Sequence, residues 1–281
     1  MGIKLYKPTT PGRRGASVQD FSDTTRMEPE KSLTFVIQPK SGRNNTGRIT
    51  VRHQGGGVKR LYRMVDFKQQ KFDVPATIKE IEYDPNRGAR IILVEYADGI
   101  KSYWLAPQGI KVGDKLMSSQ QKIESSIGNR MPLEYIPVGL FVHNVELTSG
   151  KGGQIVRGAG NSAQFMVIEG DYAQLKLPSG EMRLVKKNCL ASVGVVSNPD
   201  YRLVRLGKAG RKRKQGWRPH VEGKNMNPVD HRHGGGEGHS PIGLRGGPVT
   251  PWGKKAMGVK TRDKGKWSNK FIIQRRNKKK A

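Results

Sequence analysis

Residues 225–239 concentrate side chains that could bind a metal ion or transfer a proton. Two histidines separated by one residue, as in His231 and His233, can bind zinc on an extended loop. A structural zinc site also needs four ordered ligands with supporting hydrogen bonds, and this segment has little apolar sequence to order them. We therefore predict no metal site. The candidate ligands considered are Asp230, His231, His233, Glu237 and His239.

The same segment contains the residue types of a hydrolytic triad, Ser240, His231 and Asp230. Triads depend on a geometry that a rigid scaffold provides, and a run of glycines follows the histidines. His220 and Glu222 match part of the zinc-deaminase signature, but the Pro-Cys-x-x-Cys that completes it is absent. We predict that the chain is not an enzyme.

Glycine-rich loops with basic residues occur over residues 41–48, 52–60 and 150–161. Glycine lets backbone N–H groups approach a phosphate closely, and arginine can contact phosphate, sugar and base edges. The third loop is not a nucleotide-binding P-loop, because Ala159 stands where that motif requires lysine. The alternatives are a flexible hairpin tip for the third loop and a solvated linker for the first two.

The distribution of charge favours a polyanionic partner. The 281 residues include 52 Lys and Arg against 23 Asp and Glu, a net charge of +29. Residues 61–204 contribute only +3, whereas residues 1–60 contribute +8 and residues 205–281 contribute +18. The last segment also has 14 Gly and 5 Pro, so alone it should be disordered. We expect a balanced body between two basic arms that take their structure from RNA.

Several protein classes are disfavoured. No apolar run approaches the length of a transmembrane helix, and residues 1–8 lack the apolar core of a secretory signal. The single cysteine, Cys189, cannot form an internal disulfide or a cysteine zinc site. These features predict a cytoplasmic location without membrane contact.

The body has the patterns of β-structure. Residues 76–83 alternate apolar and polar side chains, as a half-buried strand does, and a Pro–Gly turn follows. Two sets of short antiparallel strands indicate two small barrels, while residues 114–127 could be strand or short helix. Further strands are expected at 90–96, 100–105, 139–147, 164–169, 172–177, 181–187 and 190–196.

One helix is expected after residue 197. Asn198 suits the N-cap and Pro199 the first helical position, and Gly207 would end the helix. Tyr201 and Leu203 would contribute to its buried face.

Three tryptophans lie in the basic C-terminal segment, Trp217, Trp252 and Trp267. They have no local apolar partners, so they could stack on bases or anchor the segment to a neighbouring protein. The final basic run over residues 275–280 would bind any polyanion and indicates no particular partner.

Residues 227–238, Asn-Pro-Val-Asp-His-Arg-His-Gly-Gly-Gly-Glu-Gly, closely resemble the signature loop of the L-two family of large-ribosomal-subunit proteins, bacterial or organellar type. The resemblance covers essentially the whole chain in order, which makes it far more specific than any single motif. The other matching stretches are residues 8–14, 42–49, 52–57, 65–67, 82–87, 142–146, 150–154, 179–183 and 248–253.

The resemblance implies a mainly β fold in which an OB-like barrel over residues 61–130 precedes an SH3-like barrel over residues 131–204. Extended basic arms would occupy residues 1–60 and 205–281. It implies a structural protein that binds large-subunit rRNA, contacts other ribosomal proteins and supports association with the small subunit at an intersubunit bridge. It also implies proximity to tRNA and the peptidyl transferase centre. No cofactor is expected, although Mg²⁺ shared with rRNA stays open.

By analogy, the basic and aromatic residues of the arms and loops would contact rRNA. These are Arg43, Arg48, Arg52, His53, Lys59, Arg60, Lys151, Arg157, Arg211, Arg213, Trp217, Arg218, Asn227, Arg232, Trp252, Lys254 and Arg275. The residues expected nearest the peptidyl transferase centre are Asp230, His231, His233, Gly234, Gly235, Gly236 and Glu237.

Two positions depart from the family pattern, which usually has a basic residue where Glu222 stands and proline where Arg232 stands. A free φ and an added charge at residue 232 would make this loop depend more on phosphate contacts. Two other functions stay open. One is a nonspecific nucleic-acid-compacting protein, and the other is a metal-dependent hydrolase that uses Asp230, His231 and His233.

Overall fold

The computed structural model describes residues 2–237 and 241–276. These residues form two compact units. The first, here called the β body, comprises residues 2–38, 59–209 and 270–276, and the second, here called the basic unit, comprises residues 39–58, 210–237 and 241–269. Gly238, His239 and Ser240, which entered the signature-loop, metal and triad interpretations, lie outside the described residues, as does most of the final basic run, residues 277–280.

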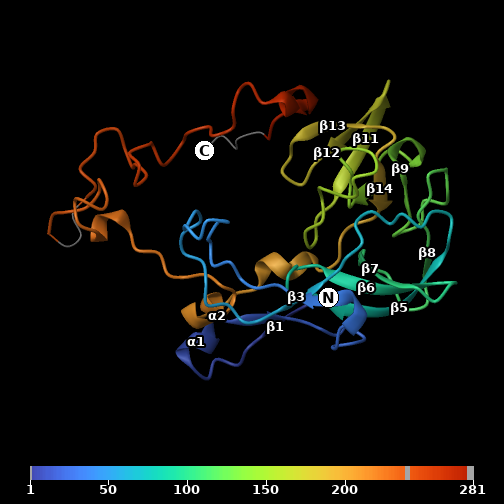
Figure 1. Ribbon diagram of the computed structural model, residues 1–281, viewed down its shortest axis with the longest axis horizontal. Helices are drawn as coiled ribbons and strands as arrows, with labels where there is room; N and C mark the ends of the chain where they lie inside the picture. The colour runs from blue at the N-terminus through green and yellow to red at the C-terminus, as the bar shows by residue number, and fades with distance from the viewer. Residues whose placement is uncertain (1, 238–240, 277–281) are drawn as a thin grey trace. The chain divides into compact units, whose positions relative to one another are not determined.

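Four antiparallel strands form the sheet of the first barrel in the order β7-β6-β5-β8 (Figure 1). They are β5 (Ala76–Tyr83), β6 (Arg90–Tyr96), β7 (Lys101–Leu105) and β8 (Lys115–Leu116). Successive side chains of a strand point to opposite faces, so Ile92 and Val94 of β6 join one apolar cluster, and Ile91 and Leu93 join another. The nearly uninterrupted apolar run of β6 reflects this burial on both faces.

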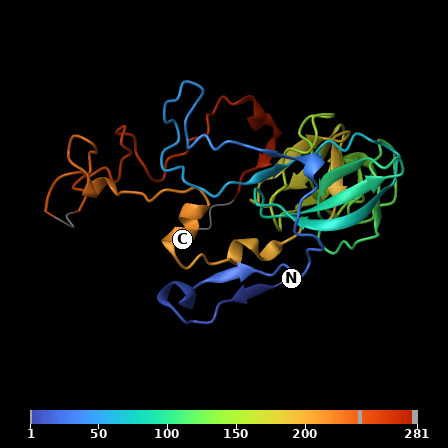
Figure 2. The same ribbon diagram turned by 60° about the horizontal axis from the view of Figure 1, so that its bottom comes forward.

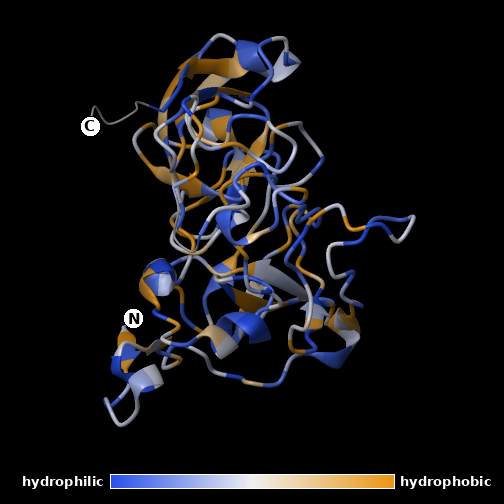
Figure 3. Cartoon of the chain, turned by 90° about the vertical axis from the view of Figure 1, so that its left-hand side faces the viewer, coloured by the Kyte–Doolittle hydropathy of each residue, from blue (hydrophilic) through white to orange (hydrophobic). Residues whose placement is uncertain are grey.

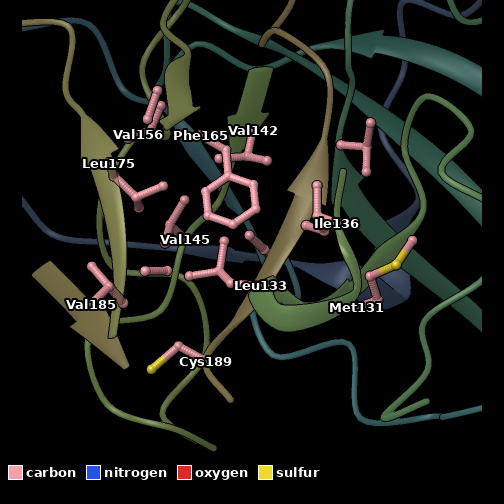
Figure 4. Packing of buried hydrophobic residues seen from close by; sticks show 14 residues of the cluster. Met131, Leu133, Ile136, Val142, Val145, Val156, Phe165, Leu175, Val185 and Cys189 are labelled. Atoms are coloured by element: carbon pink, nitrogen blue, oxygen red, sulfur yellow. The ribbon is translucent and has the colours of Figure 1, made fainter. Parts of the chain in front are cut away.

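A seven-stranded antiparallel sheet forms the second barrel, in the order β15-β13-β12-β11-β10-β14-β9. Phe165 lies at the centre of its core, among Leu133, Val142, Val145 and Leu175 (Figure 4). The strands are β9 (Arg130–Pro132), β10 (Phe141–His143), β11 (Ala163–Glu169), β12 (Tyr172–Lys176), β13 (Met182–Lys186), β14 (Leu190–Val193) and β15 (Ile272–Gln274).

Short elements complete the described chain. An antiparallel ribbon pairs β1 (Ile3–Leu5) with β2 (Ser17–Gln19), and its strands are dark blue in Figure 2. A second ribbon pairs β3 (Thr34–Val36) with β4 (Leu61–Arg63). The α-helices are α1 (Pro11–Arg14) and α2 (Ala209–Lys214), and the 3-10 helices are η1 (Lys31–Leu33), η2 (Leu133–Tyr135), η3 (Pro199–Leu203), η4 (Gly223–Asn225) and η5 (Trp267–Phe271).

The predicted fold class is confirmed: the chain is mainly β, with an OB-like barrel followed by an SH3-like barrel. Hydrophobic residues recur along the strands, while the long loops are largely hydrophilic (Figure 3). Within residues 2–237 and 241–276, no helix is long and apolar enough to cross a membrane. The segment boundaries at residues 60, 130 and 204 stay a prediction.

Several expected strands are shorter than their sequence pattern. The strand expected over 139–147 is regular only in β10 and ends where Asn144 adopts a positive φ of 49°. The strand expected over 190–196 stops at Gly194, which has a φ of 106°. Of the ambiguous residues 114–127, only β8 is regular. Positive φ interrupts the extended backbone that a strand requires.

The expected helix after Asn198 is wrong in type and in its buried face. Residues 199–203 form the 3-10 helix η3, and Asn198 has a left-handed φ of 60° without capping it. Its side-chain amide instead donates to the carbonyl of Gly88 at 2.6 Å. Tyr201 and Leu203 remain 43% and 56% exposed. A good capping residue is therefore used for a long-range contact.

A buried histidine makes the second barrel sensitive to acid. His143 of β10 donates from Nδ1 to the carbonyl of Gly194 at 3.0 Å. Burial lowers the pKa of His143 from 6.5 to about 4, against the opposing effect of this hydrogen bond. The unfolded chain therefore binds this proton at a higher pH than the native chain does. Stability should be lost as pH falls from about 6.5 towards about 4, by about 3 kcal/mol.

The measurement is the urea-unfolding free energy at pH 7 and at pH 4.5 for the wild type and His143→Asn. The asparagine amide can replace the Nδ1 donor but does not titrate. We expect the wild type to lose more stability than the variant over this interval. An equal loss of unfolding free energy in the wild type and in His143→Asn would contradict the assignment of the acid sensitivity to His143.

Candidate nucleic-acid interface

The glycine run at residues 55–57 builds the backbone of the basic unit. Gly55 donates to the carbonyl of Gly216 at 2.8 Å, and Val58 donates to that of Lys214 at 2.9 Å. A Cβ on Gly57 would lie 3.0 Å from Cα of Gly216, so two backbones approach where a side chain would not fit. The solvated-linker interpretation of the loop over residues 52–60 is therefore wrong for residues 55–58.

Side-chain contacts also hold residues 53–58 against residues 213–220. Nη1 of Arg213 donates to the carbonyls of Gly55 at 3.3 Å and Trp217 at 3.2 Å. The His53 ring stacks on His220 with centroids 3.7 Å apart. Part of the donor capacity of Arg213 is thus used inside the protein, whereas Trp217 is 43% exposed.

A hairpin presents two predicted RNA ligands. Arg43 and Ile49 form an antiparallel bridge, and the side-chain oxygen of Asn44 accepts hydrogen bonds from the amides of Thr46 and Arg48, each at 3.0 Å. The asparagine holds the turn from inside, as such residues commonly do. Arg43 and Arg48 are both exposed beside it.

A second hairpin, residues 248–256, exposes an aromatic ring. Thr250 donates to the carbonyl of Lys254 at 2.7 Å, and Ala256 donates to that of Pro248 at 2.8 Å. Trp252, between them, is 74% exposed. The Arg52 guanidinium lies 5.3 Å from its ring centroid. The hairpin thus offers a base-stacking face with a cation beside it.

The histidine-rich loop is sharply turned. His231 donates from its amide to the carbonyl of Asn227 at 3.2 Å, and Gly234 donates to that of His231 at 2.8 Å. A Cβ on Gly234 would lie 2.5 Å from the carbonyl oxygens of Met226 and Asn227. The glycine is therefore required by close backbone contact.

Both histidines of this loop accept hydrogen bonds from backbone amides. His231 is buried, and its Nδ1 accepts from the amide of His233 at 3.0 Å. Nε2 of His233 accepts from the amide of Val249 at 2.9 Å. These lone pairs are consequently unavailable to a metal ion. No cluster of three potential metal ligands exists among residues 2–237 and 241–276.

Charge complements this geometry. The basic unit has 18 Lys and Arg against 4 Asp and Glu, a net charge of +14. The acidic residues are too few to neutralise it, so the unit attracts a polyanion. The predicted ligands exposed in this unit are Arg43, Arg48, Arg52, Trp217, Arg218, Asn227, Arg232, Trp252 and Lys254, while His53, Arg211 and Arg213 are half-buried. Asp230, Gly235, Gly236 and Glu237 are exposed, and His233 and Gly234 are half-buried.

The two departures from the family pattern have local partners. Glu222 forms an exposed ion pair with Lys224 at 3.4 Å. The Arg232 guanidinium lies against Gly253, where a Cβ would be 2.8 Å from Cζ. The charge at residue 232 therefore lies against the Trp252 hairpin.

The glycine loop at residues 150–153 belongs to the β body and does not cradle phosphate. The buried Glu146 carboxylate accepts from the amides of Gly150 at 3.2 Å and Gly152 at 3.0 Å. Gly153 donates to the carbonyl of Phe67 at 2.8 Å. The interpretation of these amides as a phosphate site is wrong, because the protein already occupies them.

Arg130 completes this anchor. Its Nη2 donates to Glu146 at 3.2 Å and its Nη1 to the carbonyl of Asn144 at 2.7 Å. Arg130 and Glu146 are 0% and 1% exposed. Burial lowers the pKa of Arg130, and Glu146 opposes this effect. Sequence reasoning missed this pair, and its one available signal was an acidic residue four positions before the first glycine of the loop.

The remaining predicted ligands lie in the β body. Lys59, Lys151 and Arg275 are exposed, whereas Arg60 and Arg157 are half-buried. Arg60 donates to the carbonyl of Pro85 at 3.1 Å, and the Arg157 guanidinium lies 4.3 Å from the Phe67 ring centroid. Their role as RNA ligands stays a prediction.

Comparison with protein families agrees with this arrangement. Residues 30–118 match the model described as Ribosomal Proteins L2, RNA binding N-terminal domain. Residues 126–253 match the model described as Ribosomal Proteins L2, C-terminal domain. Together the two matches cover most of the chain, including the first barrel, nearly all of the second and the histidine loop. The chain therefore belongs to the ribosomal protein L2 family and is an RNA-binding protein of the large ribosomal subunit.

Proposed function

We propose that the chain binds large-subunit rRNA through the basic unit and the basic loops of the β body, and that it acts structurally. The observation that carries this proposal is the basic unit itself. Its net charge of +14 lies on backbone that hairpins, glycine contacts and histidine stacking hold in place. Lys and Arg would neutralise phosphates and release counterions, while exposed tryptophans stack on bases.

The proposed site extends to the loop from Asp230 to Glu237. We place this loop nearest the peptidyl transferase centre, where it would support tRNA binding and subunit association. The resemblance in residues 227–238 supports this placement, and so does the exposure of Val229, which is 90%. The protein would supply position and charge there, and the RNA would perform the chemistry.

A tethered probe tests this placement. Cys189 is buried, and burial raises the pKa of its thiol to about 11, so it should not react with thiol reagents at neutral pH. Val229→Cys would therefore give one reactive thiol for a hydroxyl-radical-generating iron chelate. We expect large subunits carrying it to show cleavage of rRNA around the peptidyl transferase centre and of the 3′ end of bound tRNA.

Wild-type chain treated with the same reagent is the background control. Asp171→Cys is the matched control, since Asp171 is exposed in the turn between β11 and β12. It should give a different cleavage pattern without tRNA cuts. Cleavage from residue 229 confined to rRNA distant from the centre would overturn the placement. Protein that leaves the subunit in a high-salt wash and spreads over DNA would instead favour the nonspecific-binding hypothesis.

A further inference from the structure

We propose that His231 and His233 are positioning residues that act together as hydrogen-bond acceptors and hold the Trp252 hairpin against the histidine loop. The inference rests on the proposed function, because the hairpin is a proposed RNA contact. It differs from an acid–base or metal role, since it assigns each histidine a specific ring nitrogen that must carry no proton.

The hydrogen bonds define which nitrogen accepts. A backbone N–H can only donate, so Nδ1 of His231 accepts from His233 and Nε2 of His233 accepts from Val249. An accepting nitrogen has a free lone pair, and a neutral ring carries its proton on the other nitrogen. The proton of His231 is therefore on Nε2, and the proton of His233 is on Nδ1.

The surroundings of His231 fix its ring. The residue is 7% exposed. A Cβ on Gly223 would lie 2.5 Å from Nδ1 and 2.6 Å from Cε1 of the ring. The two histidine rings contact each other with centroids 4.6 Å apart. The ring is thus packed against backbone, and its Nδ1 is directed to the next turn of the loop.

His233 connects the histidine loop to the Trp252 hairpin through a hydrogen bond. Val249, which donates its amide hydrogen bond to His233, forms an antiparallel bridge with Lys255 at the base of the hairpin over residues 248–256. Arg232, between the histidines, lies against Gly253 of the same hairpin. Two consecutive residues therefore contact the hairpin at two points, one at its base and one near Trp252. A change at His231 should reach the RNA-facing tryptophan through this path.

Asparagine and glutamine distinguish the two nitrogens. The Oδ1 of asparagine occupies the position of Nδ1 of histidine, and the Oε1 of glutamine occupies that of Nε2. The inference predicts opposite outcomes at the two sites. His231→Asn should retain the acceptor and His231→Gln should lose it, whereas His233→Gln should retain it and His233→Asn should lose it.

The readout is chemical probing of rRNA in large subunits that contain each variant as their sole copy of the full-length chain. Nucleotides exposed by Trp252→Ala define the hairpin contact. We expect His231→Asn and His233→Gln to leave these nucleotides protected. His231→Gln and His233→Asn should reduce their protection about tenfold, because a half-buried backbone amide loses its acceptor.

Hydrogen exchange of the backbone amides of residues 233 and 249, measured in the same particles, reports on the two hydrogen bonds directly. This measurement tests the inference independently of whether the hairpin contacts RNA. If Trp252→Ala exposes no nucleotide, the hairpin is not an RNA contact, and the exchange pattern still decides the inference. Glutamine performing as well as asparagine at residue 231, or asparagine as well as glutamine at residue 233, overturns it in either readout. All four variants behaving like the wild type would also overturn it.

Discussion

Replacing Arg130 with methionine is expected to destabilise the native chain by about 3–5 kcal/mol. The replacement leaves Glu146 buried with a negative charge and leaves the Asn144 carbonyl without its 2.7 Å donor. Apolar contact with methionine recovers part of the packing but none of the charge compensation. The measurement is the free energy of urea unfolding of the full chain.

The opposite member of the pair should also matter. In Glu146→Gln, one carboxylate oxygen becomes an NH₂ group that faces donors. In the wild type, Oε1 of Glu146 accepts hydrogen bonds from Arg130 and Gly152, and Oε2 accepts hydrogen bonds from Gly150 and Leu190. At least one amide therefore loses its acceptor, at a cost of about 1–3 kcal/mol, and the buried Arg130 loses its counter-charge as well. Faster amide exchange at residues 150–152 should accompany this loss.

An exposed ion pair provides the control. Lys187 and Asp171 lie 3.2 Å apart with side chains 38% and 86% exposed. Exposed pairs contribute little because water screens them, so Asp171→Asn should leave the unfolding midpoint nearly unchanged. If Arg130→Met proved as mild as this control, the buried pair would not anchor the glycine loop.

Periodicity was sufficient to predict the strands with the strongest patterns. Residues 76–83 and 90–96 are β5 and β6, because alternation and a continuous apolar run each reflect how many faces of the strand are buried. The family and the barrel types followed from ordered motifs. Local patterns did not predict β15, a three-residue strand in a basic segment whose pairing with β13 depends on residues about ninety positions earlier.

The sequence identified the glycine-rich basic loops of the candidate site but not the residues that they contact. The glycines at 55–57 and 150–153 were expected to let backbone come close to a phosphate, and in the structure Gly57, Gly152 and Gly153 do have backbone atoms of other residues close by. Their partners were different: residues 214–216 for the first run and Glu146 for the second. A sequence shows that backbone is accessible, but the tertiary fold decides whether a phosphate or a carboxylate reaches it.

The histidines illustrate the same limit. His-x-His spacing is compatible with metal ligation, catalysis or structural hydrogen bonding, and the choice among these depends on which ring nitrogen is free and on the groups around it. Here a glycine at residue 223 lets the His231 ring pack against backbone, and Val249 is a partner sixteen positions from His233. Neither contact has a local signal. The role of these histidines therefore depends on the tertiary fold and not on their local sequence.

Removing two charges from the Asn44 hairpin should weaken RNA binding strongly while leaving the fold intact. Arg43 and Arg48 are exposed, and their side chains are not needed for the turn, which the Asn44 side chain holds through backbone amides. If each arginine contacts one phosphate, Arg43→Gln/Arg48→Gln should lower affinity for large-subunit rRNA by roughly 100-fold. This corresponds to about 1.4 kcal/mol for each charge-assisted contact.

Salt dependence distinguishes phosphate contacts from loss of shape. Neutralising two phosphate contacts should reduce the slope of log affinity against log salt by about 1.4 to 1.8. The matched control is Arg43→Lys/Arg48→Lys, which keeps both charges and should keep the slope while losing some bidentate affinity. Filter binding of full-length chains to protein-free large-subunit rRNA measures both quantities. An unchanged slope in the glutamine variant would show that this hairpin does not contact phosphate, and an equal loss in both variants would mean that arginine geometry matters more than its charge.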